Sequence, residues 1–227
     1  MRYLVGNWKS NKTLDESLQW FAEMQAVNIP HETEVVICPP FTYLAALASD
    51  ERRATSLKLG VQDVSPFPYG AYTGAIAVEM VKQWVQYAIV GHSERRKYFH
   101  ESLQDVANKV DRCIEVGITP IVCVDEEYVE AQLAAINDAN MAKIIVAYEP
   151  LSAIGSGTPD TPDHAVQVAL AIKDKAGVDV PVLYGGSVKP ENIQSFLSHA
   201  EISGALVGGA SQDPHAWQDL IAASTLV

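Results

Sequence analysis

Eight short apolar runs recur along the chain, separated by stretches in which polar and apolar residues are mixed. Most of these runs are continuously apolar and do not alternate with polar residues, a pattern typical of parallel strands that are covered on both faces. The pattern predicts strands at Tyr3–Val5, Val35–Cys38, Leu57–Val61, Tyr87–Val90, Thr119–Val124, Ile144–Tyr148, Val180–Tyr184 and Ala205–Val207.

Several of the intervening stretches carry apolar residues at helical spacing. The predicted helices include Leu14–Met24, Leu103–Val116, Ala165–Ile172 and the stretch after Pro190 that contains Ile193, Phe196 and Leu197. Thr161 and Pro162 give the third of these helices an N-cap and a first helical residue. Strands therefore alternate with helices along most of the chain.

This alternation, with right-handed crossovers, predicts a parallel α/β fold. An open doubly wound sheet and a closed barrel both fit it. Eight units without a glycine-rich dinucleotide turn after the first strand favour a (β/α)₈ TIM barrel. No linker or low-complexity tract divides the chain, so we expect a single domain over residues 1–227.

The chain has 227 residues, of which 48% are hydrophobic, and a formal net charge of −12. The hydrophobic fraction is ordinary for a globular protein with a sizeable core. We expect no nucleic acid partner, because a chain this acidic is a poor binder of polyanions. A small phosphate ligand remains compatible with the charge, since it needs only a few well-aimed donors.

Cysteine use favours a cytoplasmic protein. Cys38, Cys113 and Cys123 are widely spaced, and we expect them to be reduced and buried. No cysteine pair has metal-ligand spacing and no HxxxH-type pair occurs, so we expect no metal. We also expect no signal peptide and no membrane span, because no stretch approaches the roughly 20 apolar residues that a span requires.

In a barrel of this class, catalytic residues lie where strands end and loops begin. The first run is followed by Asn7-Trp8-Lys9. Lys9 would place a positive charge at the barrel mouth, where it can meet an anionic substrate. The alternative is a solvated surface lysine.

The fourth run leads directly into a polar hexapeptide that begins Gly91-His92-Ser93-Glu94 and continues with two arginines. His92 is placed to hydrogen-bond a ligand, unless it is a structural histidine. Glu94 and the two arginines could simply form a surface ion-pair group.

A carboxylate, Glu149, emerges directly after the sixth run and is followed by Pro150, which starts a loop. A carboxylate at this place suits a general base. The loop Leu151–Gly157 is apolar, small and glycine-bearing, as a lid over a water-sensitive intermediate must be. A plain connecting loop is the alternative.

Glycine pairs follow the last two runs, as Gly185-Gly186-Ser187 and Gly208-Gly209. Such glycines let backbone N–H groups approach an anion, and barrels commonly bind phosphate at the loops after strands seven and eight. Either pair alone could be an ordinary tight turn.

Five segments, in order along nearly the whole chain, resemble the triosephosphate isomerase family. They are Asn7-Trp8-Lys9, the hexapeptide Gly91–Arg96, Ala147–Pro150 with Ala153–Gly155, Tyr184–Val188, and Leu206–Ser211. The resemblance implies interconversion of dihydroxyacetone phosphate and D-glyceraldehyde 3-phosphate, with a small phosphorylated triose as substrate and neither metal nor organic cofactor.

The resemblance also implies roles for individual residues. Glu149 would be the base, and His92 the electrophile that hydrogen-bonds the enediolate oxygens. A neutral histidine at a helix N-terminus is a known feature of this family, and Ser93-Glu94 could begin such a helix. Lys9 would balance negative charge. Asn7 would orient Lys9, and Glu94 would pair with Lys9. The phosphate group would be held by backbone N–H groups of four further residues, Gly155, Ser187, Gly208 and Gly209.

The chain departs from the family in its length and in its lid. Cys123 and Glu149 are only 26 positions apart, so the fifth helix, around Glu126–Asn140, must be shortened. Ser152 stands where the family usually has tryptophan, and Pro159 lies in the far hinge. We expect a lid that still closes but is less firmly latched.

A further loop, Tyr69–Ala75, resembles the family segment that docks into a partner subunit. Ala75 replaces a usual acidic residue, but Thr73 is retained and the loop is aromatic, so we expect a homodimer. Two other functions remain open. One is a different phosphate-sugar barrel enzyme, and the other is a catalytically silent barrel that acts as a scaffold.

Overall fold

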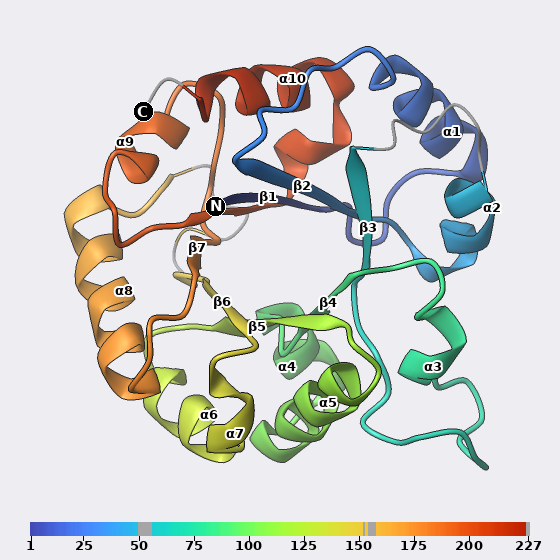
Figure 1. Cartoon of the computed structure of the whole chain (residues 1–227), viewed down its shortest axis with the longest axis vertical. Helices are drawn as coiled ribbons and strands as arrows, with labels where there is room; N and C mark the ends of the chain where they lie inside the picture. Colours follow the sequence, from blue (N-terminus) through green and yellow to red (C-terminus); the bar gives the residue numbers. More distant parts are fainter. Residues whose placement is uncertain (50–55, 152, 154–157, 226–227) are drawn as a thin grey trace.

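Eight parallel strands hydrogen-bond to one another in chain order around a closed barrel (Figure 1). The computed structural model describes residues 1–49, 56–151, 153 and 158–225. The strands are β1 (Arg2–Asn7), β2 (Thr33–Cys38), β3 (Leu57–Val61), β4 (Tyr87–Val90), β5 (Thr119–Val124), β6 (Ile145–Tyr148), β7 (Val182–Tyr184) and β8 (Gly204–Val207). The predicted TIM barrel and its eight strand positions are confirmed.

The barrel closes where β1 pairs with β8, with Leu4 opposite Ala205. Gly204 makes this closure possible, because a Cβ there would overlap the carbonyl oxygen of Tyr3. At β7 the strand begins two residues later than predicted. Pro181 lies at that point, and proline has no N–H to give to the ladder.

Helices surround the barrel on all sides (Figure 1). They are α1 (Leu14–Glu23), α2 (Leu44–Ser49), α3 (Val78–Val81), α4 (Ser93–Phe99), α5 (Leu103–Glu115), α6 (Val129–Ala135), α7 (Asp138–Met141), α8 (Pro162–Ala176), α9 (Ile193–Leu197) and α10 (Pro214–Ala223), with 3₁₀ turns η1 (Phe41–Tyr43) and η2 (Gly209–Gln212). The predicted N-cap Thr161 accepts a hydrogen bond from the N–H of His164.

The fifth helix is short, as the spacing predicts. Seven-residue α6 and four-residue α7 together cover the route from β5 to β6. Within the described ranges, the helices are all too short or too polar to cross a membrane.

Apolar side chains form two layers. One fills the barrel interior and includes Val5, Val36 and Ile121. The larger layer lies between the strands and the helices and includes Trp20, Phe21 and Trp217. Because both faces of each strand are buried, the strands read as continuous apolar runs.

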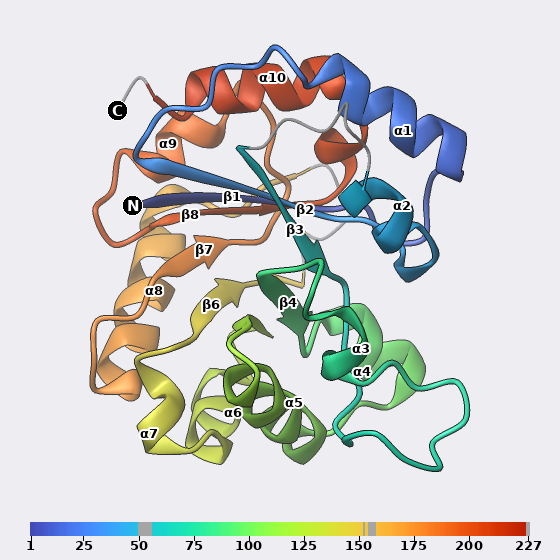
Figure 2. The same ribbon diagram turned by 45° about the vertical axis from the view of Figure 1, so that its right-hand side comes forward.

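One loop extends far from the barrel, between β3 and α3 (Figure 2). The N–H of Ser65 donates to the carbonyl of Ile76 and closes its base. Phe67 and Tyr72 stack near its tip with ring centroids 4.5 Å apart. Both rings, together with Tyr69, are exposed.

Candidate functional site

The carboxyl ends of five strands meet around a cavity of about 620 Å³. Most of the predicted site residues line it, namely Asn7, Lys9, His92, Glu149, Ser187, Gly208 and Gly209. Glu94 lies beside it and contacts Lys9. Gly155, and with it Ser152, lies outside the described residues. The sequence therefore brings its candidate residues together at one end of the barrel.

His92 is the N-cap of α4, the helix that Ser93-Glu94 was predicted to begin. Its Nδ1 accepts the N–H of Glu94 at 3.2 Å, so Nδ1 carries no proton in this hydrogen bond. The ring proton is then on Nε2, which lies 3.0 Å from Oε1 of Glu149. The helix terminus thus fixes the tautomer that points a donor into the cavity.

Glu149 is almost completely buried, with 2% of its surface exposed. The N–H of Glu149 donates to the carbonyl of Val124 on β5, which fixes its main chain at the barrel end. Its Oε2 accepts the N–H of Ser93 at 3.0 Å, while Oε1 faces His92. Both carboxylate oxygens are therefore held by α4 or its cap.

Lys9 follows β1 and has a positive φ of 54°, a conformation that is uncommon for residues other than glycine. Its Nζ lies 2.6 Å from Oε1 of Glu94. Its N–H donates to Oδ1 of Asn7 at 3.0 Å. The predicted pairing with Glu94 and orientation by Asn7 are both present as contacts.

The loop after β8 is held by hydrogen bonds to two of its own carbonyl groups. Ser211 donates its hydroxyl to the carbonyl of Gly208 at 2.6 Å. The indole Nε1 of Trp8 donates to the carbonyl of Ser211 at 3.0 Å. In the loop after β7, Ser187 donates its hydroxyl to the carbonyl of Ala153 at 2.6 Å. The first two bonds hold the loop after β8 in place, and the third joins the loop after β7 to the loop 151–157.

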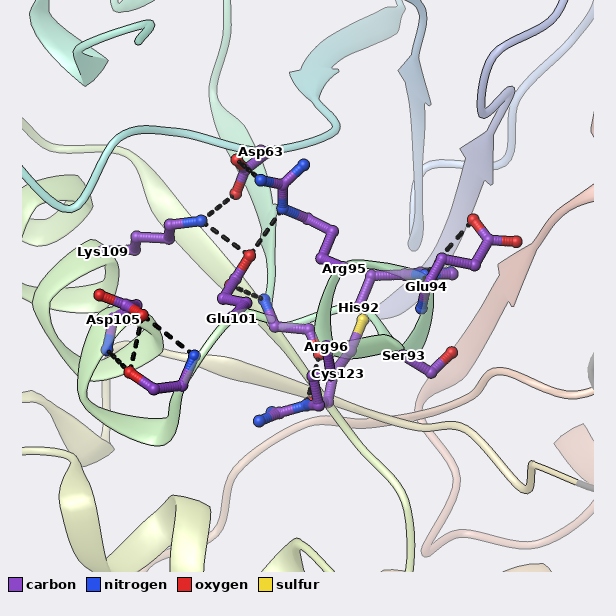
Figure 3. A network of polar contacts seen from close by, with 12 residues as sticks. Asp63, His92, Ser93, Glu94, Arg95, Arg96, Glu101, Asp105, Lys109 and Cys123 are labelled. Atoms are coloured by element: carbon purple, nitrogen blue, oxygen red, sulfur yellow. Dashed lines mark hydrogen bonds and ion pairs between the residues drawn. The ribbon is translucent and has the colours of Figure 1, made fainter. Parts of the chain in front are cut away.

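Behind His92 lies a network of four charged side chains from separate elements (Figure 3). Arg95 and Lys109 each pair with both Asp63 and Glu101, at 2.6 to 2.9 Å. Lys109 and Glu101 are 3% and 4% exposed, whereas Asp63 and Arg95 are 13% and 28% exposed, so the network is buried at its Lys109–Glu101 pair and reaches the surface at Arg95. Burial raises the pKa of Asp63 to about 6, against the opposing effect of the two cations.

This network corrects the idea that the arginines of the hexapeptide form a surface group. Arg95 joins the network, and Arg96 donates to the carbonyls of Gly91 and Cys123. Glu101 also accepts the N–H of Gly91, directly before His92, at 3.2 Å. The network therefore supports the segment that carries the candidate electrophile.

Another polar cluster lies after the loop 151–157. The N–H of Asp160 donates to the hydroxyl of Tyr184 at 2.8 Å. Oδ2 of Asp160 accepts from the hydroxyl of Tyr148 at 3.2 Å and lies 2.7 Å from Nδ1 of His164. The hydrogen bond with Asp160 is the main cause that raises the pKa of His164.

Among the described residues, no group of three or more His, Cys, Asp or Glu side chains is arranged to hold a metal ion. The cavity instead offers a carboxylate, an imidazole donor and an ammonium group around one space. Such a set can move a proton and stabilise the negative charge that develops next to it.

Comparison with known proteins gives a consistent result. Residues 2–224 match the family model described as triosephosphate isomerase. The chain is 40% identical to the triosephosphate isomerase of Mesomycoplasma hyorhinis over 92% of each chain. It is 38% identical to that of Solibacter usitatus, over 96% of this chain and 97% of the relative. It is also 38% identical to that of Aquifex aeolicus, over 97% and 98% respectively.

Proposed function

The chain belongs to the triosephosphate isomerase family, and on this premise we propose that it interconverts dihydroxyacetone phosphate and D-glyceraldehyde 3-phosphate through an enediolate. The observation that carries the proposal is the pairing of Glu149 with His92 at the wall of the cavity, with Lys9 lining the same space. The reaction is proton transfer alone, and these side chains supply the groups that it needs.

Glu149 acts as the base. It removes a proton from the carbon next to the substrate carbonyl, and as the protonated acid it delivers a proton to the neighbouring carbon, which was the carbonyl carbon. In the same reaction a proton passes from the hydroxyl oxygen to the former carbonyl oxygen. Burial of Glu149 supports this role, because a carboxylate without a full water shell is free to meet a carbon acid.

His92 acts as the electrophile. Its Nε2–H donates to the substrate oxygens as negative charge develops on them, and the N–H of Glu94 on Nδ1 maintains that tautomer. Lys9 adds a fixed positive charge for the enediolate and the phosphate dianion, with Asn7 orienting it. Preorganised donors of this kind contribute roughly 3–4 kcal/mol each to transition-state stabilisation.

The phosphate group binds at the loops after β7 and β8. The backbone N–H groups of Ser187, Gly208 and Gly209 are its donors, with Gly155 as a fourth from outside the described residues. Two hydroxyl bonds support this assignment, because that of Ser211 holds the loop after β8 next to the cavity and that of Ser187 joins the loop after β7 to the loop that carries Gly155.

We propose in addition that the protein is a cytoplasmic homodimer. The extended loop between β3 and α3 exposes Phe67, Tyr69 and Tyr72, at 44%, 65% and 43% of their surface. A cluster of aromatic rings this exposed marks a surface that a partner covers. The three buried free cysteines support a reducing compartment.

A coupled assay tests the proposed function. Purified protein is given D-glyceraldehyde 3-phosphate, and dihydroxyacetone phosphate is detected by a dehydrogenase that consumes it. Isomerisation supports the proposal. A folded protein that leaves this substrate unchanged contradicts the proposal. The two alternatives, an enzyme for another phosphorylated sugar and a catalytically silent scaffold, would both give that result.

A further inference from the structure

The main chain of Lys9 is in the left-handed region, at φ 54°. A residue with a Cβ holds this conformation at an energetic cost, and it persists where surrounding groups fix it. Lys9 is also a residue on which the proposed reaction depends. The contacts of its own peptide groups therefore bear directly on where its ammonium group lies.

Two side chains bind those peptide groups. Asn7 accepts the N–H of Lys9, at 3.0 Å. On the other side, Nε2 of Gln62 donates to the carbonyl oxygen of Lys9 at 2.8 Å. The same Nε2 donates to the carbonyl oxygen of Cys38 at 2.9 Å. Both hydrogens of one amide group are thus used, and the amide joins the ends of β1 and β2.

Gln62 is suited to this contact by its place in the fold. It follows the last residue of β3 directly and is half-buried. The end of β2 is fixed in turn, because the carbonyl of Cys38 also accepts the N–H of Trp8 at 3.2 Å. Gln62 does not line the cavity, so it has no direct contact to make with a substrate there.

The direction of the Lys9 side chain follows from this main-chain conformation. Its Nζ reaches Glu94 at 2.6 Å, and its Cε passes close to Gly208 in the loop after β8. A rotation of the Lys9 peptide back to a common conformation would move the ammonium group away from both. Errors of about 1 Å in such a position cost roughly 100-fold in rate.

We propose that Gln62 is a positioning residue for the reaction, acting through Lys9. It holds the carbonyl of Lys9 by an amide hydrogen and so keeps the ammonium group between Glu94 and the phosphate loop. This proposal rests on the proposed function, since that function gives Lys9 its role. Glutamate has nearly the same shape but, when ionised, offers no hydrogen to either carbonyl.

A double-mutant cycle tests the proposal. Gln62→Met removes the donors at similar length, and it is made alone and together with Lys9→Met. For each protein, kcat and KM with D-glyceraldehyde 3-phosphate and the affinity for phosphoglycolate are measured. We expect Gln62→Met alone to lower kcat/KM by roughly 10- to 100-fold. In the Lys9→Met background, Gln62→Met should change kcat/KM and the affinity for phosphoglycolate by less than about 2-fold, because the ammonium group that Gln62 positions is absent.

Gln218→Met is the matched control, since Gln218 does not line the cavity and its amide donates instead to the carbonyl of Glu23, the last residue of α1. It should leave both readouts unchanged. If Gln62→Met does not fold, Gln62→Glu takes its place in the cycle. Near-wild-type kinetics of Gln62→Met would overturn the proposal. So would a double variant in which the effects of Gln62→Met and Lys9→Met simply multiply. If the wild type binds phosphoglycolate without isomerising the substrate, the proposed function fails, and the binding cycle still decides the role of Gln62.

Discussion

Nε2 of His92 lies 3.0 Å from Oε1 of Glu149, so the proposed electrophile and the proposed base are bonded to each other. The other oxygen of Glu149 is held by the N–H of Ser93. A substrate that takes the donor of His92 must therefore displace Glu149 from this position. In the proposed mechanism Glu149 lies against α4 without substrate, and it becomes available when a substrate oxygen takes its place at the donor of His92.

The double role of His92 can be separated by two substitutions. His92→Asn keeps a side-chain oxygen that can cap α4 but cannot reach Glu149, whereas His92→Ala loses both contacts. We expect both variants to lose roughly 10²- to 10³-fold in kcat. Only His92→Ala should also lose about 1 kcal/mol of unfolding free energy. Steady-state kinetics and denaturant unfolding measure the two effects, and an active His92→Asn enzyme would rule out the electrophile role.

The pKa of His164 is raised above 6.5, chiefly by its hydrogen bond to Asp160, with Glu126 acting in the same direction. Since the folded value exceeds the unfolded one, the stability from this pair is complete below about pH 6.5. That stability is lost as the pH rises through the folded value. An NMR titration should show the raised midpoint, and Asp160→Asn should lower it. A His164 midpoint at or below 6.5 in the wild type would show that the pair does not form.

The three cysteine thiols should be unreactive in the native protein. Burial raises the pKa of all three, to about 12 for Cys113, and the neighbouring Glu149 adds to the effect at Cys123. A thiol reagent at pH 8 should find no reactive cysteine in the folded protein and three in denaturant. Rapid modification of a native thiol would contradict the buried positions.

The exposed loop between β3 and α3 should carry the dimer contact. We expect light scattering to give twice the chain mass at micromolar concentration. Tyr72→Asp should shift the protein toward monomers, because it removes the stack with Phe67 and adds a charge. Leu170→Asp, at an exposed position on α8, is the control, because α8 lies across the barrel from this loop in Figure 1. A wild type that is monomeric and fully active would refute the assembly.

The apolar pattern predicted the fold because nearly every strand residue is buried on one of two faces. It missed the start of β7, where the missing N–H of Pro181 outweighs the apolar character of Val180. The candidate site was predictable because its residues follow directly after strands. Strand position places Glu149 and His92 at the same end of the barrel, after β6 and β4, whereas their joint role was implied by the family resemblance.

Other contacts left no signal in the sequence. The pairing of Asp63 with Lys109 joins positions 46 residues apart, and no spacing rule connects them. Arg95 reads as a surface charge because its neighbours in sequence are polar, whereas its partners come from other elements. The role that we propose for Gln62 depends on the positive φ of Lys9, which the residue type of Lys9 does not predict.

The most direct test of the central claim is proton NMR of the isomerisation in deuterium oxide, for the wild type and for Glu149→Gln. The wild type should form product that carries deuterium on the carbon that gains a proton, because the base exchanges its proton with solvent. Glu149→Gln should be slower by about 10²- to 10⁴-fold while still binding phosphoglycolate. Conversion by a verified Glu149→Gln protein at the wild-type rate would contradict the role of Glu149 as the base.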